Sequence, residues 1–589
     1  MTIALFAVTA AGRRAADEVA AALGPDAVIV TEPVRDALPR LWPSLDAAVF
    51  FLATGATVRL IAPLLADKSS DPGVVCVDEG RRFAVALAGG HGGGANALAE
   101  RVATVLGATP VITTASDSTA TTSLDELVEL LDATVVGDLP AVAVAVLDGE
   151  PVRLFNPLRF PLPPLPPNVT PEAEQPACTI AIDDRLPAEP TEHSGSPIAR
   201  TGRSFELRLV PRTLVVGIGS ARGVPVEAVR AALERLSIEH GLDLRAVRAY
   251  ATVDVKVDEA GILGATGSTP LLTYPADALA TVDVPNPSEV VRAAVGTPSV
   301  AEAAALLAAT ELAHGAPVEL AAPKIIGDNV TVAAARIRPR GRLALVSLGP
   351  GAPELRLPRA DAELRRAAVV VGLDQYVDQV RHLLRPGTQV RTSGLGDEEL
   401  RAADAVAQAA AGNAVALLGS GDVGVYAMAS PALLQAGEDV EVVGVPGVTA
   451  ALAAAALLGA PLGHDHVSIS LSDLHTPWPV IERRIMAAAA ADLVTCFYNP
   501  RSKARDWQLG TALDLLRKHR SPQTPVGAVR QAGRPGERIW WAPIADFDPA
   551  DVDMLTTVIV GSSTTTVVAG RMVTRRGYRW SEDVPNMIE

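Results

Sequence analysis

Three glycine-rich turns in the second half of the chain are the clearest candidates for a ligand site. Each follows directly on a run of apolar residues, and they span Leu345–Gly351, Leu417–Tyr426 and Val443–Ala451. Small residues at the carboxyl end of a buried strand let a ligand approach the backbone closely. The first turn lacks the Gly-x-Gly-x-x-Gly pattern of dinucleotide-binding proteins, and Pro353 interrupts it. Any one of them is compatible with a structural turn, but their succession predicts a small-molecule site.

A fourth glycine-rich turn, Gly89–Asn96, suggests proton-transfer chemistry in the first half of the chain. It joins a predicted strand to a predicted helix, so its amide groups suit an anion. The imidazole of His91 could protonate a leaving oxygen or activate water near neutral pH. The competing interpretation is a packed loop with a solvent-facing histidine.

Basic side chains gather behind a short aromatic segment. Arg501, Lys503 and Arg505 follow Tyr498, and Arg530 ends a later apolar run. A guanidinium group binds a carboxylate through two parallel hydrogen bonds, so these residues are candidates for binding an acidic ligand. A solvated charged surface is the alternative.

The elements that carry these turns are predicted by apolar runs that alternate with helical patterns. Strands are expected at 2–8, 47–53, 73–77, 83–87, 214–220, 247–255, 343–348, 368–372, 414–418, 441–445, 493–498 and 556–560, and helices at 12–23, 57–66, 95–106 and 224–240. Such alternation is typical of layered α/β domains. The predicted fold class is therefore a multidomain α/β protein.

Changes in composition predict the domain boundaries. The proline density of Pro157–Pro167 and the polar sequence up to residue 203 exclude helices and central strands, except for one or two strands around Thr179–Ile182. We predict an α/β domain at 1–125, an irregular proline-rich middle region and linker at 126–210, a second α/β domain at 211–338 and a last α/β domain at 341–589.

Composition limits the classes of function. The formal net charge of −16 argues against a nucleic-acid partner, whose binding face is basic. Cys76, Cys178 and Cys496 are far apart, which gives no metal motif and favours a reduced, cytoplasmic setting. No run of apolar residues is long enough for a membrane span. We therefore expect no metal site and no membrane partner.

Residues 343–589 resemble the tetrapyrrole (corrin and porphyrin) methylases in the order of the three turns and in several further segments. These are Ala460–Asp465, Ser468–Trp478, Phe497–Lys503, Thr524–Gly533, Thr556–Ser563 and Gly570–Thr574. Together they are similar to the precorrin-3B C(17)-methyltransferases, although Val423 stands where that family usually has proline. The resemblance implies a two-lobed α/β domain, S-adenosylmethionine as methyl donor and a homodimer formed through this domain.

The resemblance also implies roles for individual residues. The residues expected to contact S-adenosylmethionine are Pro353, Ser420, Gly421, Asp422, Val425, Thr449, Ala450 and Asn499. Thr449 could instead serve only as a helix N-cap. The many carboxylates of the macrocycle would be bound by Arg501, Lys503 and Arg530. Ring contraction needs proton transfer, for which His464, Asp473 and Tyr498 are the candidates.

Residues 1–340 resemble the cobalt-precorrin-5A hydrolases. The matching segments are Ala62–Lys68, Asp71–Gly80, Gly90–Asn96, Val111–Asp117, Gly217–Gly219, Ala251–Lys256, Pro285–Glu289 and Gly296–Ser299. Ser220 stands where we expect cysteine in that family. The resemblance implies lactone opening with release of a two-carbon fragment, His91 as a catalytic residue, and Asn96 and Lys256 as substrate contacts.

The leading hypothesis is a bifunctional enzyme of corrin-ring synthesis. It would methylate C(17) of precorrin-3B or its cobalt form, contract the ring, and open a lactone on a later intermediate. In the alternative only the methyltransferase is catalytic, and the amino half binds and hands over tetrapyrroles. The Phe497–Ser502 segment disfavours a methylase for another ring position. The expected partners are small-molecule tetrapyrroles and other enzymes of the same pathway.

Overall fold

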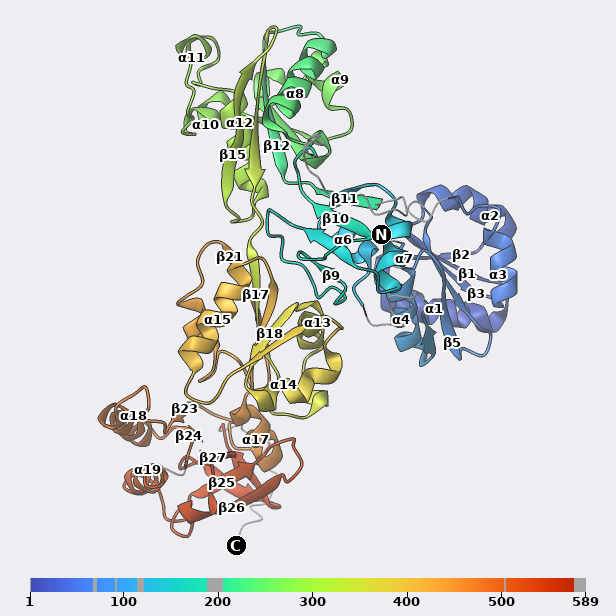
Figure 1. Ribbon diagram of the computed structural model, residues 1–589. Coiled ribbons are helices and arrows are strands. Elements are labelled where there is room, and N and C mark those ends of the chain that lie inside the picture. Colours follow the sequence, from blue (N-terminus) through green and yellow to red (C-terminus); the bar gives the residue numbers. More distant parts are fainter. Residues whose placement is uncertain are drawn as a thin grey trace. The chain divides into compact units, whose positions relative to one another are not determined.

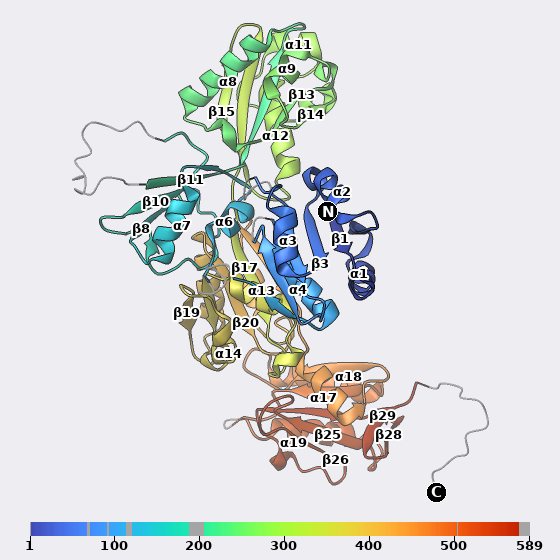
Figure 2. The same ribbon diagram turned by 90° about the vertical axis from the view of Figure 1, so that its right-hand side faces the viewer.

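The computed structural model describes residues 2–66, 71–90, 93–113, 121–187, 205–502 and 505–576 (Figures 1 and 2). Its contacts divide the chain into two units, residues 1–339 with 385–387 and residues 340–384 with 388–589. Strands alternate with helices in both units, which confirms the predicted α/β class.

The first sheet has six strands in the order β2-β1-β3-β4-β5-β6. Its elements are β1 (Ile3–Ala7), α1 (Ala10–Leu23), β2 (Ala27–Val30), α2 (Val34–Leu41), β3 (Ala47–Phe51), α3 (Thr54–Ile61), β4 (Gly73–Val77), β5 (Phe83–Ala88), α4 (Ala95–Leu106) and β6 (Thr109–Val111). Val19 of α1 and Leu98 of α4 pack on one face, and Leu38 of α2 and Ile61 of α3 pack on the other. The result is a three-layer domain.

The middle region is more regular than its proline content predicts. It holds α6 (Leu124–Leu130), β7 (Ala133–Val136), α7 (Leu139–Leu147), β8 (Val152–Phe155), β9 (Val169–Thr170), β10 (Cys178–Ile182) and β11 (Phe205–Pro211), with the strand order β7-β11-β10-β8-β9. The expectation of an irregular region over 126–210 is therefore wrong for its described residues. The prolines of 157–167 lie between β8 and the two-residue edge strand β9, where no ladder hydrogen bond is lost.

The third sheet has the order β14-β13-β12-β16-β15. Its elements are β12 (Leu214–Ser220), α8 (Val226–His240), β13 (Val247–Val253), α9 (Ala260–Thr266), β14 (Leu271–Tyr274), α10 (Ala276–Ala280), α11 (Glu289–Val295), α12 (Ala301–Leu312), β15 (Val318–Ile326) and β16 (Val330–Ile337). Helix α12 packs on β12 so closely that a Cβ on Gly217 would stand 1.9 Å from the carbonyl oxygen of Ala301. Glycine is required at this crossing.

The second unit opens with a parallel five-stranded lobe of the order β19-β18-β20-β17-β21. It comprises β17 (Gly341–Ser347), α13 (Pro358–Arg366), β18 (Val369–Gly372), α14 (Asp374–Val380), β19 (Gln389–Thr392), α15 (Glu398–Ala410), β20 (Ala414–Gly419), α16 (Ala429–Leu433) and β21 (Val440–Val445). Leu364 of α13 and Val377 of α14 cover one face, and Ala405 of α15 and Ala432 of α16 cover the other. Central strands covered on both faces read as continuous apolar runs, as predicted here.

The carboxyl-terminal lobe has a mixed sheet, β23-β24-β27-β25-β26, and a small sheet, β22-β29-β28. Its elements are α17 (Ala450–Leu458), β22 (Gly459–Ala460), β23 (His466–Ser470), α18 (Trp478–Ala490), β24 (Val494–Tyr498), α19 (Gln508–Arg517), β25 (Pro525–Arg530), β26 (Arg538–Pro543), β27 (Thr556–Val560), β28 (Thr565–Val568) and β29 (Arg571–Thr574). Ile485 of α18 and Leu513 of α19 pack on one face, and Leu458 of α17 packs on the other.

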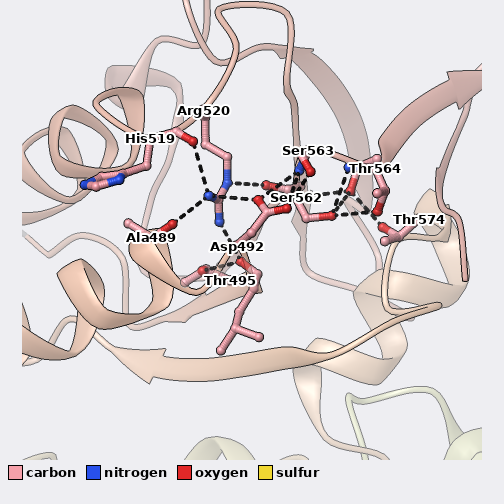
Figure 3. A network of polar contacts seen from close by, with 12 residues as sticks. Ala489, Asp492, Thr495, His519, Arg520, Ser562, Ser563, Thr564 and Thr574 are labelled. Atoms are coloured by element: carbon pink, nitrogen blue, oxygen red, sulfur yellow. Dashed lines mark hydrogen bonds and ion pairs between the residues drawn. The ribbon is translucent and has the colours of Figure 1, made fainter.

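A buried arginine holds the loops at one end of this lobe together (Figure 3). Arg520 donates to the carbonyl oxygens of Ala489, Leu493 and Gly561 at 2.9, 3.0 and 3.1 Å. Its guanidinium also lies 3.0 Å from the carboxylate of Asp492. Burial lowers the pKa of Arg520, and Asp492 opposes that effect. The network is structural, because it ties the loop after α19 to the end of α18 and to the loops that follow α18 and β27.

The described residues lack two further features. No helix in that part of the chain is both long and apolar enough to cross a bilayer. Nor do three or more His, Cys, Asp or Glu side chains converge there in a way that could hold a metal ion.

Candidate functional site

The three glycine-rich turns meet at one edge of the parallel lobe. Strand β17 lies between β20 and β21 and runs parallel to both. The carboxyl ends of parallel strands share an edge of the sheet, which is where open α/β sheets bind ligands. The turns after β17, β20 and β21 are therefore neighbours in space although they are far apart in the sequence.

The first two turns are joined through their backbones. The amide of Gly349 donates to the carbonyl of Gly421 at 3.1 Å, and the amide of Gly421 donates back at 2.7 Å. Gly421 has a φ of +67°, a conformation that favours glycine. These paired glycines hold the loop after β17 against the loop after β20.

Asp422 joins the second turn to the third. One carboxylate oxygen accepts a hydrogen bond from the Gly424 amide at 2.8 Å, and the other accepts from the Gly447 amide at 3.0 Å. A Cβ on Gly447 would stand 2.4 Å from the Gly421 carbonyl oxygen, so the two turns are in direct contact. Asp422 therefore holds the two loops together, and each of its carboxylate oxygens accepts a hydrogen bond from a main-chain amide.

Val423 makes a contact that proline could not make. Its backbone amide donates to the Ser347 hydroxyl at 2.8 Å, and its side chain is buried. The residue that departs from the resembled family thus ties the second turn to the end of β17.

Tyr498 caps the helix that begins at the third turn. The Thr449 side chain makes no capping bond within its own helix, α17. Instead the Tyr498 hydroxyl accepts from the Ala451 amide at 3.0 Å and lies 2.7 Å from the Thr449 hydroxyl oxygen. Burial raises the pKa of Tyr498, while the hydrogen bonds to Thr449 and Ala451 oppose that rise. A protonated phenol held in this way favours a positioning role over the predicted proton transfer.

Tyr426, which sequence reasoning did not single out as a site residue, links the lobes from the other side. Its hydroxyl donates to the Ser468 carbonyl oxygen of β23 at 2.7 Å. Its ring centroid lies 5.2 Å from that of Tyr498. Next to this pair, the Asn499 side-chain amide donates to the Ser470 hydroxyl at 3.1 Å. The ends of β23 and β24 thereby form the second wall of the site.

Arg534 is the residue that sequence reasoning missed most clearly. It lies in the loop after β25 and donates to the Pro350 carbonyl oxygen and, at 3.1 Å, to the Ser420 hydroxyl. The Thr524–Gly533 segment predicted as part of the resemblance ends one residue before it. That glycine is the signal that could have drawn attention to the next side chain.

The other predicted cofactor contacts lie on the same loops. Pro353 is exposed behind the first turn, and Val425 follows the second turn with its amide donating to the Asp422 carbonyl oxygen at 3.1 Å. Ala450 is the first residue of α17. Seven of the eight predicted cofactor contacts thus lie after β17, β20 or β21, and Asn499 follows β24 of the other lobe.

The predicted acid–base residues lie in different surroundings. His464 is exposed, and its Nδ1 accepts from the Asp465 amide at 2.7 Å. Asp473 accepts from the Gln508 side chain at 3.2 Å and lies 3.8 Å from Arg505. Neither contacts Tyr498 through a hydrogen bond. The structure does not bring the three candidates together into one proton relay.

Two of the three predicted carboxylate-binding residues already have partners within the chain. Arg501 donates to the Pro549 carbonyl oxygen at 3.2 Å. Arg530 forms an ion pair with Asp553 at 2.7 Å, which holds the pKa of Asp553 below its usual value despite partial burial. Lys503 lies outside the described residues.

In the first unit the structure places two of the three predicted site residues. His91 lies outside the described residues. Asn96 is buried in the first turn of α4, behind a crossing so tight that a Cβ on Gly73 would stand 2.1 Å from the Gly93 carbonyl oxygen. Lys256 is buried in the third sheet domain, with its ammonium group 3.0 Å from Glu259.

The family comparisons agree with this division of the chain. The profile of the tetrapyrrole (corrin/porphyrin) methylases matches residues 342–548. The profiles described as cobalamin synthesis G N-terminal and cobalamin synthesis G C-terminus match residues 36–117 and 214–335.

Individual relatives narrow the comparison. Over 242 residues the chain is 48% identical to a Salmonella typhimurium protein described as a probable cobalt-factor III C(17)-methyltransferase, covering 40% of this chain and 99% of that one. Over 236 residues it is 45% identical to a Sinorhizobium precorrin-3B C(17)-methyltransferase, covering 39% and 91%. A crystal structure of the methyltransferase CobJ aligns at 36% identity with a TM-score of 0.38, covering 40% of this chain and 100% of that one.

The match to a complete relative, together with the three profiles, identifies both parts of the molecule. The chain belongs to the tetrapyrrole (corrin/porphyrin) methylases, which use S-adenosylmethionine, and carries the two cobalamin synthesis G modules in the same polypeptide.

Proposed function

We propose that the second unit methylates C(17) of precorrin-3B or its cobalt form, or of cobalt-factor III, and that ring contraction follows at the same enzyme. The identity to C(17)-methyltransferases over almost their full length supports this assignment. The observation that carries it in the structure is the interlocked set of turns at Gly349, Gly421 and Gly447. The proposed domain limits are 1–125, 126–210 for the middle region, which forms a sheet of its own, 211–338, and 341–589 for the methylase.

The turns are suited to S-adenosylmethionine because their small residues let the ligand approach the main-chain groups closely. That molecule supplies an activated methyl group, so the transfer needs positioning and exclusion of water more than acid–base catalysis. Asp422 and Tyr498 keep the loops and the start of α17 in place from two sides. We assign Pro353, Ser420, Gly421, Asp422, Val425, Thr449, Ala450 and Asn499 to this cofactor site.

Binding of the acceptor follows from its carboxylates. Arg501, Lys503 and Arg530 remain the proposed contacts, and Arg530 would share its guanidinium between Asp553 and the substrate. For ring contraction, His464 is the most accessible of the three candidate groups because its imidazole is exposed.

We propose further that the first unit opens the lactone of cobalt-precorrin-5A. The two cobalamin synthesis G profiles support this reading. His91 would move the proton, and Asn96 and Lys256 would contact the substrate. In the alternative, the first unit only binds and hands over tetrapyrroles.

Variants of the full chain separate these two readings of the first unit. Replacing an acid–base group costs about 100-fold or more in rate. His91→Ala should therefore slow release of the two-carbon fragment by that factor while methyl transfer continues at the parent rate. Hydrolysis within a few-fold of the parent would remove His91 from the mechanism, and no hydrolysis by the parent chain would favour the hand-over role.

The methyltransferase proposal is tested with the full chain, S-adenosylmethionine and either metal-free or cobalt-loaded acceptor. Mass spectrometry should detect one added methyl group with at least one of the two acceptors. A homodimer formed through the second unit is part of this proposal, and its mass in solution is the corresponding measurement.

A further inference from the structure

The guanidinium of Arg534 lies between the two lobes of the methylase unit. It reaches from the loop after β25 to the carbonyl of Pro350 in the first turn and to the hydroxyl of Ser420 in the second. Only two of its three nitrogens make hydrogen bonds with described residues, because Nη1 has no acceptor there. The third nitrogen is therefore available to a ligand.

No described carboxylate forms an ion pair with Arg534. Glu537 is in the same loop, but its carboxylate accepts from the Gly533 amide at 2.7 Å. By contrast, Arg530 in the adjoining strand is neutralised by Asp553. A partly buried guanidinium held by neutral acceptors alone leaves its charge uncompensated, which favours an anionic ligand.

The surrounding backbone is shaped around this side chain. A Cβ on Gly351 would stand 2.2 Å from Nε and 2.5 Å from Cγ of Arg534, so the arginine occupies the space of a side chain. Gly351 has a φ of +135° and Gly533 a φ of +69°. A Cβ on Gly533 would also lie 3.1 Å from that of Ala352. The loops fit together only with glycine at these positions.

Further polar groups lie around Ser420. Burial raises the pKa of Tyr376 and the Glu398 carboxylate adds to that rise, while Arg534, a hydrogen bond to Ser420 and Arg401 oppose it. Arg401 is itself buried, and it donates to the Ser393 hydroxyl and the Gly394 carbonyl and contacts the Met428 sulfur. Two guanidinium groups and one carboxylate, that of Glu398, therefore act on the same phenol.

We propose that Arg534, fixed by Ser420 and Pro350, is the recognition residue for a carboxylate of the bound substrates. The inference rests on the proposed methyltransferase function. The carboxylate has two possible sources, the amino-acid end of S-adenosylmethionine and the acid side chains of the tetrapyrrole. A charge-assisted contact of this kind changes affinity by about 10- to 100-fold.

Binding measurements on the full chain test the proposal without turnover. The probes are S-adenosylhomocysteine, 5′-methylthioadenosine, which lacks the amino-acid end, and uroporphyrin, a stable tetrapyrrole with carboxylate side chains. The variants are Arg534→Gln and Arg534→Lys, and the matched control is Arg538→Gln on the exposed strand β26. Calorimetry measures the nucleoside probes, and fluorescence measures uroporphyrin.

Each source gives its own pattern. If the cosubstrate provides the carboxylate, Arg534→Gln weakens the binding of S-adenosylhomocysteine about 10- to 100-fold and leaves the affinity for 5′-methylthioadenosine unchanged. If the tetrapyrrole provides it, the affinity for uroporphyrin falls by that factor and the affinities for both nucleosides are unchanged. Arg534→Lys should retain part of the affinity, because it keeps the charge and loses the planar fork. If Arg534→Gln does not fold, the affinities of Arg534→Lys alone test the proposal.

Three results would overturn the proposal. They are affinities within twofold of the parent for every probe, equal losses for both nucleosides, and equal losses for the Arg538→Gln control. Absence of S-adenosylhomocysteine binding by the parent chain would instead count against the methyltransferase function itself, so the two failures are distinguishable.

Discussion

Substituting asparagine for Asp422 should loosen the cofactor site without unfolding the chain. The carboxylate accepts two main-chain hydrogen bonds, one from Gly424 within its own turn and one from Gly447 in the next. Asparagine has a single acceptor oxygen, so one of these bonds is lost and an N–H donor then faces another N–H donor. A hydrogen bond to a charged group contributes about 1.5–3 kcal/mol.

The loss of one such bond, about 2 kcal/mol, corresponds to a factor of roughly 30 in an equilibrium constant. Only molecules with closed turns bind the cofactor, so the apparent affinity is reduced in proportion to the fraction that stays closed. Asp422→Asn should therefore weaken the binding of S-adenosylhomocysteine about 10- to 100-fold. Calorimetry on the full chain measures this change. Asp439→Asn is the matched control, because Asp439 is exposed at the opposite end of β21. Affinity within twofold of the parent would refute the role of Asp422 in holding the turns.

Three further predictions concern stability and reactivity. Arg520→Met should destabilise the methylase unit by about 3 kcal/mol, since buried carbonyls lose their donor, and denaturant unfolding followed by fluorescence checks this. The hydrogen bond from Lys256 lowers the pKa of Glu259 from 4.5, so the pair stabilises the fold above that value and is lost as pH falls through the lowered one. Glu259→Gln should accordingly reduce the unfolding midpoint at pH 7, and the difference from the parent should shrink toward zero in acid; a constant difference would contradict it. Native protein should react slowly with a thiol reagent at pH 8, because all three cysteines are buried and burial raises the pKa of Cys496 to about 12. Rapid labelling of any one thiol before denaturation would disprove that.

The predictable part of the fold is the part with strong local signals. The expected strands at 343–348, 414–418 and 493–498 are present, because buried strands read as continuous apolar runs. Strands β19 and β26 were not predicted, since each carries exposed polar or charged residues that break the pattern. The sheet of the middle region was missed for a related reason. Its short strands alternate with prolines, which conceal the apolar core around Ile180.

The candidate site shows the same limit. Glycine turns at Gly421 and Gly447 could be found because glycine is itself a signal of close backbone approach. The capping of α17 by Tyr498 and the reach of Arg534 to Pro350 join residues 47 and 184 positions apart. No periodicity encodes such contacts, so the sequence indicated which loops matter and not which side chains connect them.

Methyl transfer by the intact chain tests the central claim most directly. Purified protein is incubated with S-adenosylmethionine carrying an isotopically labelled methyl group, and with precorrin-3B and cobalt-factor III in separate reactions. The account predicts that one labelled methyl group appears on C(17) of at least one acceptor, located by mass spectrometry and NMR. Label at another ring carbon, or no label on either acceptor although the chain binds S-adenosylhomocysteine, would contradict it.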